Sequence, residues 1–100
     1  MSLPIQLDQE RVAEFCQRNH IVRLSLFGSV LREDFGPDSD VDVLVEFAPG
    51  SVVTLLDMVR MEDELAEIVE RKVDLRTPED LRRYFRAKVL ANAVVQYAAV

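Results

Sequence analysis

The sequence predicts an α/β domain in which helices and strands alternate around a small mixed sheet of three strands. Residues 21–27 and 40–47 are short runs rich in β-branched and apolar residues, which predict two strands. Residues 52–70 form a long amphipathic stretch, which predicts a helix. A crossover helix of that length suits a parallel return strand, predicted at 72–76. The predicted order is α-β-α-β-α-β-α in one domain, residues 1–100.

The first helix is predicted to begin just after Asp8. The Asp8 side chain can cap free N–H groups, and Glu10 favours the positive end of the helix dipole. An apolar stripe at helical spacing follows, made of Val12, Ala13, Phe15 and Cys16. The only histidine, His20, comes at the helix end, where we expect an exposed residue or a partner of the dipole rather than a metal ligand.

The two central strands are predicted to form an antiparallel hairpin, because the second begins soon after the first ends. A Gly-Ser corner ends the first strand, residues 29–34 suit a short helix, and residues 35–39 form a loop around Gly-Pro. Side chains alternate along the second strand. One face carries Val41, Val43, Val45 and Phe47, and the other carries Asp40, Asp42, Leu44 and Glu46.

The second half of the chain continues the alternation. Ser51 is the expected cap of the helix at 52–70, whose apolar face includes Leu55, Met58, Val59, Glu62, Leu65, Ala66, Ile68 and Val69. In the third strand Val73 and Leu75 point one way, and Lys72, Asp74 and Arg76 the other. Thr77 is expected to cap a last helical region with Pro78 at its first position, continuing with an allowed break through Tyr97.

The composition is that of an ordinary soluble globular protein, with 49% hydrophobic and 30% charged residues. No apolar run approaches the roughly 20 residues that span a bilayer, and a signal-peptide pattern is absent, so we expect no membrane segment. The single cysteine, Cys16, excludes an internal disulfide and is expected to be a small core residue. These features predict a cytoplasmic protein.

Charge is distributed unevenly along the chain. The net charge of -6 argues against direct binding of nucleic acid. Residues 1–70 carry 5 basic and 15 acidic side chains, whereas residues 71–100 carry 7 basic and 3 acidic ones. Two interpretations stay open. The two parts are solvated surfaces of opposite bias, or the basic part contacts an anionic ligand or an acidic partner.

Five residues form the constellation that predicts chemistry. Asp40 and Asp42 share one strand face, and Asp74 joins them if the third strand lies alongside. Three converging carboxylates would hold one or two Mg²⁺ ions, which can stabilise a displacement at phosphorus. Gly28 has no side chain to block a phosphate, and Ser29 adds a hydroxyl and a helix N-terminus. Each feature is weak alone, and their combination predicts metal-assisted phosphoryl chemistry.

These residues also resemble a known family. Gly28-Ser29, ten residues and then Asp40-x-Asp42 resemble the signature of the nucleotidyltransferase superfamily related to DNA polymerase β. The short length and the run GSVLREDFGPDSDVDVLVEF are similar to the minimal nucleotidyltransferases (MNT proteins) of prokaryotes, and the resemblance covers nearly the whole chain. It implies that Gly28 and Ser29 hold the phosphates of ATP and that Asp40 and Asp42 are metal ligands. Asp74 would be the third carboxylate, which touches the metal and helps deprotonate the acceptor hydroxyl.

Two arginines have open roles in this resemblance. Arg32 would either brace the loop after Gly28 or approach the phosphates. Arg76 follows Asp74 by two residues on the same strand face, and either pairs with Asp74 or contacts a phosphate.

The resemblance implies a function as well as a site. Larger relatives add a domain for the acceptor, for which 100 residues leave no room, so the acceptor is expected in another molecule or subunit. MNT proteins resemble the antitoxin of a toxin–antitoxin module, which AMPylates a tyrosine hydroxyl of a HEPN ribonuclease toxin. The alternatives are a non-catalytic antitoxin that covers the toxin's active site, and a small-molecule nucleotidyltransferase completed by a second subunit. The three carboxylates favour an enzyme, working as a homodimer or a hetero-oligomer.

Overall fold

The computed structural model of the chain describes residues 7–28, 40–81 and 83–99, with the side chains of 83–85 excepted. Its elements are α1 (Gln9–Arg18), β1 (Ile21–Phe27), β2 (Val41–Phe47), α2 (Leu55–Val69), β3 (Val73–Arg76), the 3₁₀ helix η2 (Pro78–Asp80), α3 (Arg83–Asn92) and β4 (Val94–Ala98). The four strands form one sheet in the order β3-β2-β1-β4. The β2–β3 pair is parallel and the other two pairs are antiparallel.

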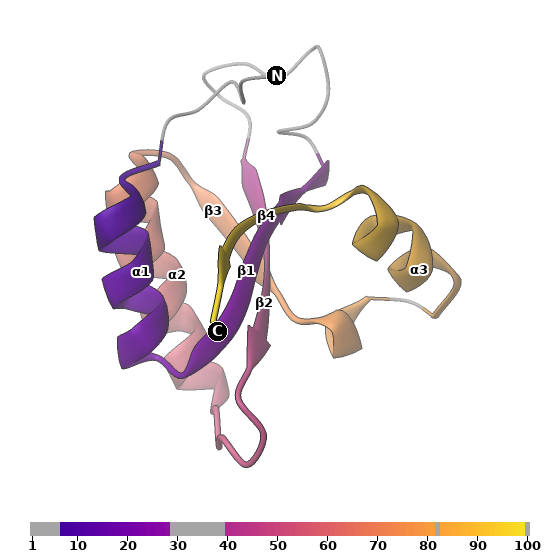
Figure 1. Ribbon diagram of the computed structural model, residues 1–100, viewed down its shortest axis with the longest axis horizontal. Helices are drawn as coiled ribbons and strands as arrows, with labels where there is room; N and C mark the ends of the chain where they lie inside the picture. The colour runs from indigo at the N-terminus through magenta and orange to yellow at the C-terminus, as the bar shows by residue number, and fades with distance from the viewer. Residues whose placement is uncertain (1–6, 29–39, 82, 100) are drawn as a thin grey trace.

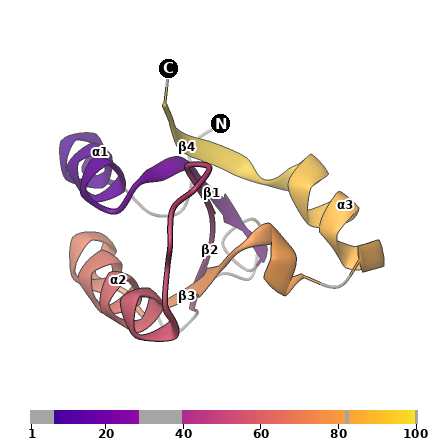
Figure 2. The same ribbon diagram turned by 90° about the horizontal axis from the view of Figure 1, so that it is seen from below.

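The helices lie on opposite faces of this sheet. Figure 1 and Figure 2 show α1 and α2 together on one face, while η2 and α3 stand on the other. The larger hydrophobic cluster fills the space under α1 and α2. Its buried members are Val12, Phe15, Cys16, Ile21, Leu24, Leu26, Val41, Val43, Val45, Met61, Leu65, Ile68, Val69, Val73 and Leu75. The apolar stripes predicted for the two helices cover this face only in part, because Leu55 and Val59, predicted on the apolar face of the second helix, are 83% and 51% exposed.

The predicted hairpin and its alternation are confirmed. β1 and β2 are antiparallel with Phe27 opposite Asp42, and β3 returns parallel to β2 with Asp74 opposite Asp42. Val41, Val43 and Val45 are completely buried beneath the helices. Their neighbours Asp42, Leu44 and Glu46 therefore point to the other face of the sheet. The short helix and loop expected at 29–39 lie outside the described residues.

The C-terminal segment corrects the predicted sheet and the predicted last helix. Helix α3 ends at Asn92, and residues 94–98 form a fourth strand beside β1 rather than a helix through Tyr97. Valine and tyrosine favour strands, and β1 offers a free edge on the side away from β2. Tyr97 also packs against the larger core cluster from this position, which a continuing helix would not allow. A sheet of three strands was therefore one strand too few.

The helix caps are partly as predicted. Asp8 caps α1, because its carboxylate accepts a hydrogen bond from the N–H of Arg11 at 3.2 Å. Helix α2 starts later than expected, with Thr54 rather than Ser51 as its cap. The Thr54 hydroxyl accepts from the N–H of Asp57 at 3.1 Å, and the Asp57 carboxylate accepts from the N–H of Thr54 at 3.0 Å. This reciprocal capping box satisfies two helix-end donors, which the lone Ser51 hydroxyl could not do.

Three smaller expectations concern single residues. Cys16 is fully buried, and burial raises the pKa of its thiol to about 12. His20 is exposed just after α1 with φ at 58°, as expected of a helix-end residue. Thr77 and Pro78 begin a helical turn as predicted, although that turn is the short η2. Among the described residues, the helices are too short or too polar to cross a membrane.

Candidate active site

The end of β1 brings Gly28 against a carboxylate of β2. Gly28 has φ at +70°, in the region that glycine adopts without strain. A Cβ atom built there would collide with Oδ2 of Asp42 and would lie 3.1 Å from its Cγ. Every larger residue would therefore displace the Asp42 side chain. The sequence predicted that this corner must lack a side chain, and the structure adds that Asp42 fills the space.

Asp74 joins Asp42 from the neighbouring strand. The two residues are partners in the parallel pairing of β2 and β3, so their side chains leave the same face of the sheet. Asp40 lies directly before β2 and is exposed. The N–H of Val41 donates to the carbonyl of Lys72 at 2.8 Å, which fixes the start of β2 against β3. The structure thus brings Asp42 and Asp74 side by side, with Asp40 two residues before Asp42.

Arg76 pairs with Asp74, which was one of its two predicted roles. Its Nε lies 3.1 Å from Asp74 Oδ1 and its Nη2 lies 3.3 Å from Oδ2. The hydrogen bond to Asp74 raises the pKa of Arg76, and the nearby carboxylates of Asp80 and Asp42 raise it further. Both side chains are partly exposed, at 48% for Arg76 and 40% for Asp74. The pair orients the Asp74 carboxylate rather than adding much stability.

The carboxylates suit a divalent cation in the type of their donor atoms. Within the described part of the chain, no three histidine, cysteine or acidic side chains gather closely enough to hold a metal ion. Both carboxylate oxygens of Asp74 face Arg76 in this arrangement. The donors that Asp40, Asp42 and Asp74 offer are oxygens, which hard cations prefer. These residues therefore fit such an ion in the type of their donor atoms.

Ser29 and Arg32, the two remaining predicted site residues, lie outside the described residues. Their predicted contacts with phosphates, and the bracing role of Arg32, stay predictions.

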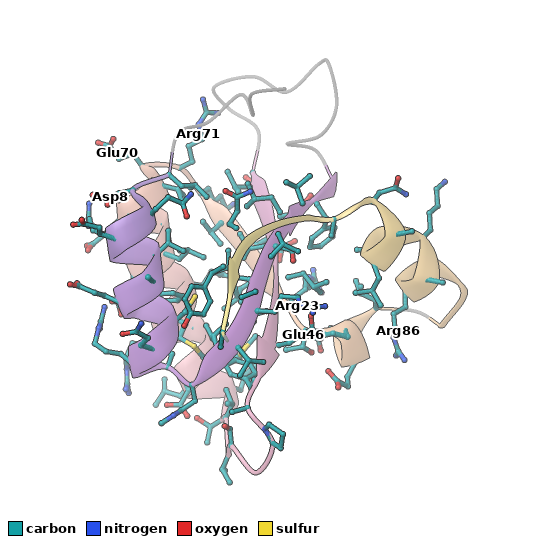
Figure 3. The ribbon with its side chains drawn as sticks, viewed as in Figure 1. Asp8, Arg23, Glu46, Glu70, Arg71 and Arg86 are labelled. Atoms are coloured by element: carbon teal, nitrogen blue, oxygen red, sulfur yellow. The ribbon has the colours of Figure 1, made fainter. Side chains whose placement is uncertain are left out.

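A small apolar cluster supports the face on which the site lies. Phe27, Leu44 and Val89 are buried together and join α3 to the sheet. Further along the same face, Arg23 of β1 and Glu46 of β2 form an ion pair, with 3.6 Å between Nη1 and Oε2. Figure 3 shows both side chains on the side toward η2 and α3. The apolar cluster explains why Leu44 is buried although it lies on the same face as Asp42.

The sequence did not identify Glu62 as a functional residue. Glu62 was assigned to the apolar face of its helix, and its carboxylate accepts a hydrogen bond from the N–H of Leu75 at 2.9 Å. This contact ties α2 to β3 directly beside Asp74. An acidic residue within an apolar stripe is the signal that could have identified it, because such a group needs a partner when it is partly buried.

Comparison with known proteins agrees with the fold. A family described as "Nucleotidyltransferase domain" matches residues 10–97. A candidate protein adenylyltransferase of Methanocaldococcus jannaschii, MJ0435, is 33% identical over 86 residues, which are 86% of this chain and 90% of the relative.

Two solved structures show the same architecture. A candidate minimal nucleotidyltransferase matches with a TM-score of 0.71 at 37% identity, over 86% of each chain. A complex of tri-AMPylated Shewanella oneidensis HEPN toxin with MNT antitoxin matches with a TM-score of 0.65 at 16% identity, over 91% of this chain and 70% of that one. The family match, the similar relative and the shared fold lead to one conclusion: this chain belongs to the nucleotidyltransferase domain family, as its Gly-Ser and Asp-x-Asp residues implied.

Proposed function

We propose that this chain is a protein adenylyltransferase that transfers AMP from ATP to a hydroxyl of a partner protein. The partner would be a HEPN-type toxin, the acceptor a tyrosine, and the transfer an antitoxin activity. Two relatives support this reading. MJ0435 is named as a candidate protein adenylyltransferase, and the S. oneidensis complex pairs an AMPylated HEPN toxin with an MNT antitoxin.

The observation that carries the proposal is the contact between Gly28 and Asp42, with Asp74 alongside. The backbone corner at Gly28 lies against the Asp42 carboxylate, so a phosphate held at this corner would lie close to that carboxylate. Carboxylates so near a phosphate would repel it unless a cation lies between them. An arrangement that combines both features therefore suits a nucleotide bound together with a divalent cation.

The proposed transfer is a displacement at the α-phosphorus of ATP. The acceptor oxygen forms a bond to that phosphorus, the bond from phosphorus to the oxygen bridging to the β-phosphate breaks, and pyrophosphate leaves. The hydroxyl proton passes to a carboxylate oxygen of Asp74, the outermost of the three acidic residues in the sheet order. Arg76 orients that carboxylate and places a positive charge beside the phosphates.

Mg²⁺ is the proposed cofactor. Asp40, Asp42 and Asp74 would hold it, and when bound it would neutralise charge on the phosphate oxygens.

One experiment tests the proposal. The purified protein is incubated with ATP labelled in its α-phosphate, Mg²⁺ and the product of the neighbouring gene, which the proposal expects to be a HEPN-type protein. We expect label on the HEPN-type protein with the wild type and none with Asp40→Ala/Asp42→Ala. Glu14→Ala removes an exposed carboxylate from α1 and is the matched control, which should transfer normally. Label should also disappear when EDTA removes the divalent cation.

The same experiment separates the two alternatives. If the double variant silences the partner fully and no protein is ever labelled, the chain acts by binding alone. If label appears only on a small hydroxylated molecule, the acceptor is not a protein. Either outcome would overturn the proposal.

A further inference from the structure

A groove of about 500 Å³ runs along the outer edge of the sheet, between β3 and the beginning of α2. β3 is the last strand on that side. The helix contributes Leu55, Met58 and Val59 to the groove, and the strand side contributes Leu75, Arg76 and Thr77. The groove is separate from the corner at Gly28, which lies across β2 from β3.

The strand edge in this groove has the geometry of a site for an added strand. Two backbone amides two residues apart bind side-chain carboxylates here rather than another strand. The N–H of Leu75 donates to Glu62 at 2.9 Å, and the N–H of Thr77 donates to Asp80 at 3.1 Å. Thr77 still has an extended backbone, with φ at −110° and ψ at 164°. An incoming strand would place its carbonyl oxygens to accept hydrogen bonds from these same two N–H groups.

The helical wall of the groove is apolar and open to water. Leu55 is 83% exposed and Val59 is 51% exposed, although Met61, Leu65, Ile68 and Val69 of the same helix are buried in the core. Val52 and Leu56 extend this apolar surface just outside the groove, at 88% and 69% exposed. A contiguous exposed apolar surface of this kind marks an interaction site.

The charge of the groove selects the occupant. Glu62 and Asp80 line it, while the one lining cation among the described residues, Arg76, is already paired with Asp74. The helix behind it adds Asp57, Asp63, Glu64 and Glu67 against Arg60. A segment that carries basic side chains between apolar ones would therefore complement this surface in both charge and polarity.

The groove shares one residue, Arg76, with the candidate active site. Arg76 lines the groove and binds Asp74, so it belongs to both. The β1–β2 corner is where the proposed function places the phosphates, on the side of β2 opposite β3. The β3 edge is thus the side from which an acceptor can reach Asp74.

We propose that an extended segment of the acceptor protein, carrying both apolar and basic residues, docks along this groove as a strand added to β3. Its carbonyl oxygens would replace the carboxylates of Glu62 and Asp80 as hydrogen-bond acceptors for the N–H groups of Leu75 and Thr77. Its apolar side chains would cover Leu55 and Val59. Only the naming of this partner as the acceptor rests on the proposed function.

Two variants with the same substitution test the docking. Val59→Lys places a cation in the groove. Val95→Lys changes a residue of equal exposure, 50% against 51%, on the opposite edge of the sheet in β4. The probe is the same protein as in the transfer experiment, the product of the neighbouring gene. We expect Val59→Lys to raise its Kd at least about tenfold, because a lysine would repel the basic segment and be stripped of water. Val95→Lys should bind within twofold of the wild type.

Binding without nucleotide and AMP transfer are measured separately, so the two proposals can fail independently. A wild type that binds the HEPN-type protein but transfers no AMP overturns the proposed function and leaves the groove tested by the Kd values. Equal Kd values for the wild type and Val59→Lys overturn the groove, even if transfer occurs. A loss confined to Val95→Lys would place the interface on β4 and also overturn it.

Cross-linking identifies the docked segment. A benzoylphenylalanine incorporated at position 59 and irradiated with the purified HEPN-type protein should cross-link to a segment rich in lysine or arginine and in apolar residues. Cross-links to an acidic helix instead would contradict the proposed occupant.

Discussion

The two faces of the sheet differ in almost every physical respect. On the face under α1 and α2, a continuous apolar cluster is closed to water, with Phe15 and Val43 completely buried. On the other face, a small cluster under α3 stands beside partly exposed charged groups, Asp74 and Arg76 among them. Figure 2 shows α1 and α2 on the first face and α3 on the second.

The difference shows that the two faces of one strand can have separate roles, one in stability and the other in chemistry. In β2 the side chains of Val41, Val43 and Val45 enter the core, while that of Asp42 meets Gly28 on the opposite face. Because neighbouring side chains point in opposite directions, a change at one position need not disturb the other property. Substitutions on the two faces should therefore separate loss of activity from loss of stability.

The largest separation is expected at Asp42. Asp42→Asn keeps the side-chain shape against Gly28 but removes its charge, so AMP transfer should fall about ten-thousandfold. The free energy of unfolding should change by less than about 1 kcal/mol, because the side chain is not part of the core. Initial rates with labelled ATP and urea unfolding measure the two effects. Glu14→Gln at an exposed position of α1 is the control, and a large loss of stability in Asp42→Asn would contradict the division between faces.

Phe15 should show the opposite behaviour. Phe15→Ala leaves a cavity under α1 and should lower the free energy of unfolding by about 4 kcal/mol. Cys16 reports on the opening of this core, because burial raises the pKa of its thiol to about 12 and keeps it protonated at pH 8. Iodoacetamide should therefore label Cys16 slowly in the wild type and much faster in the variant.

Glu14→Ala, an exposed position on the same helix, is the matched control for Phe15→Ala. It should leave both the stability and the labelling rate unchanged. Fast labelling in the wild type would show that this core is less closed than the burial of Phe15 indicates.

The sequence predicted the parts of the fold that depend on local patterns. The alternation of residues 40–47 predicted the strand β2 and which side chains lie on each of its faces. The length of the helix predicted at 52–70 indicated that β3 would return parallel to β2. The strand β4 was missed, because whether Val94 to Ala98 continue a helix or pair with β1 depends on an edge far away in the sequence. Local propensity alone could not decide between the two.

The candidate site was predictable to a similar degree. Spacing and residue type placed Asp42, Asp74 and Gly28 together, and the register of the strands agrees. The contact from Glu62 to the N–H of Leu75 was missed, because it depends on how α2 is rotated against β3. Side-chain contacts between elements follow from packing, which the pattern of one element does not determine.

A substitution at Gly28 should affect both stability and activity, each to an intermediate extent. Gly28→Ala should lower the free energy of unfolding by about 2 kcal/mol, from the strain of a positive φ together with the collision with Asp42. It should lower AMP transfer about a hundredfold, because the displaced Asp42 carboxylate loses its position. Urea unfolding and initial rates measure both.

Gly50→Ala is a matched control for Gly28→Ala. Its φ is +83°, but a Cβ there would meet no atom within 4 Å. It therefore carries the backbone strain without the collision, and should cost about 1 kcal/mol with no loss of transfer. If Gly50→Ala and Gly28→Ala had equal effects, the contact with Asp42 would have no functional consequence.

The smallest difference is expected between the two apolar clusters. Val12 and Val89 lie on helices that pack on opposite faces of the sheet, and they are 1% and 8% exposed. Val12→Ala should cost about 2.5 kcal/mol, because the closed core cannot fill the cavity. Val89→Ala should cost only about 1 kcal/mol, since the smaller cluster borders solvent and can relax. Urea unfolding of the two variants compares the faces directly, with the same methyl groups removed from each. Equal losses would show that α3 is held as firmly as α1, and that the site face contributes as much to stability as the core.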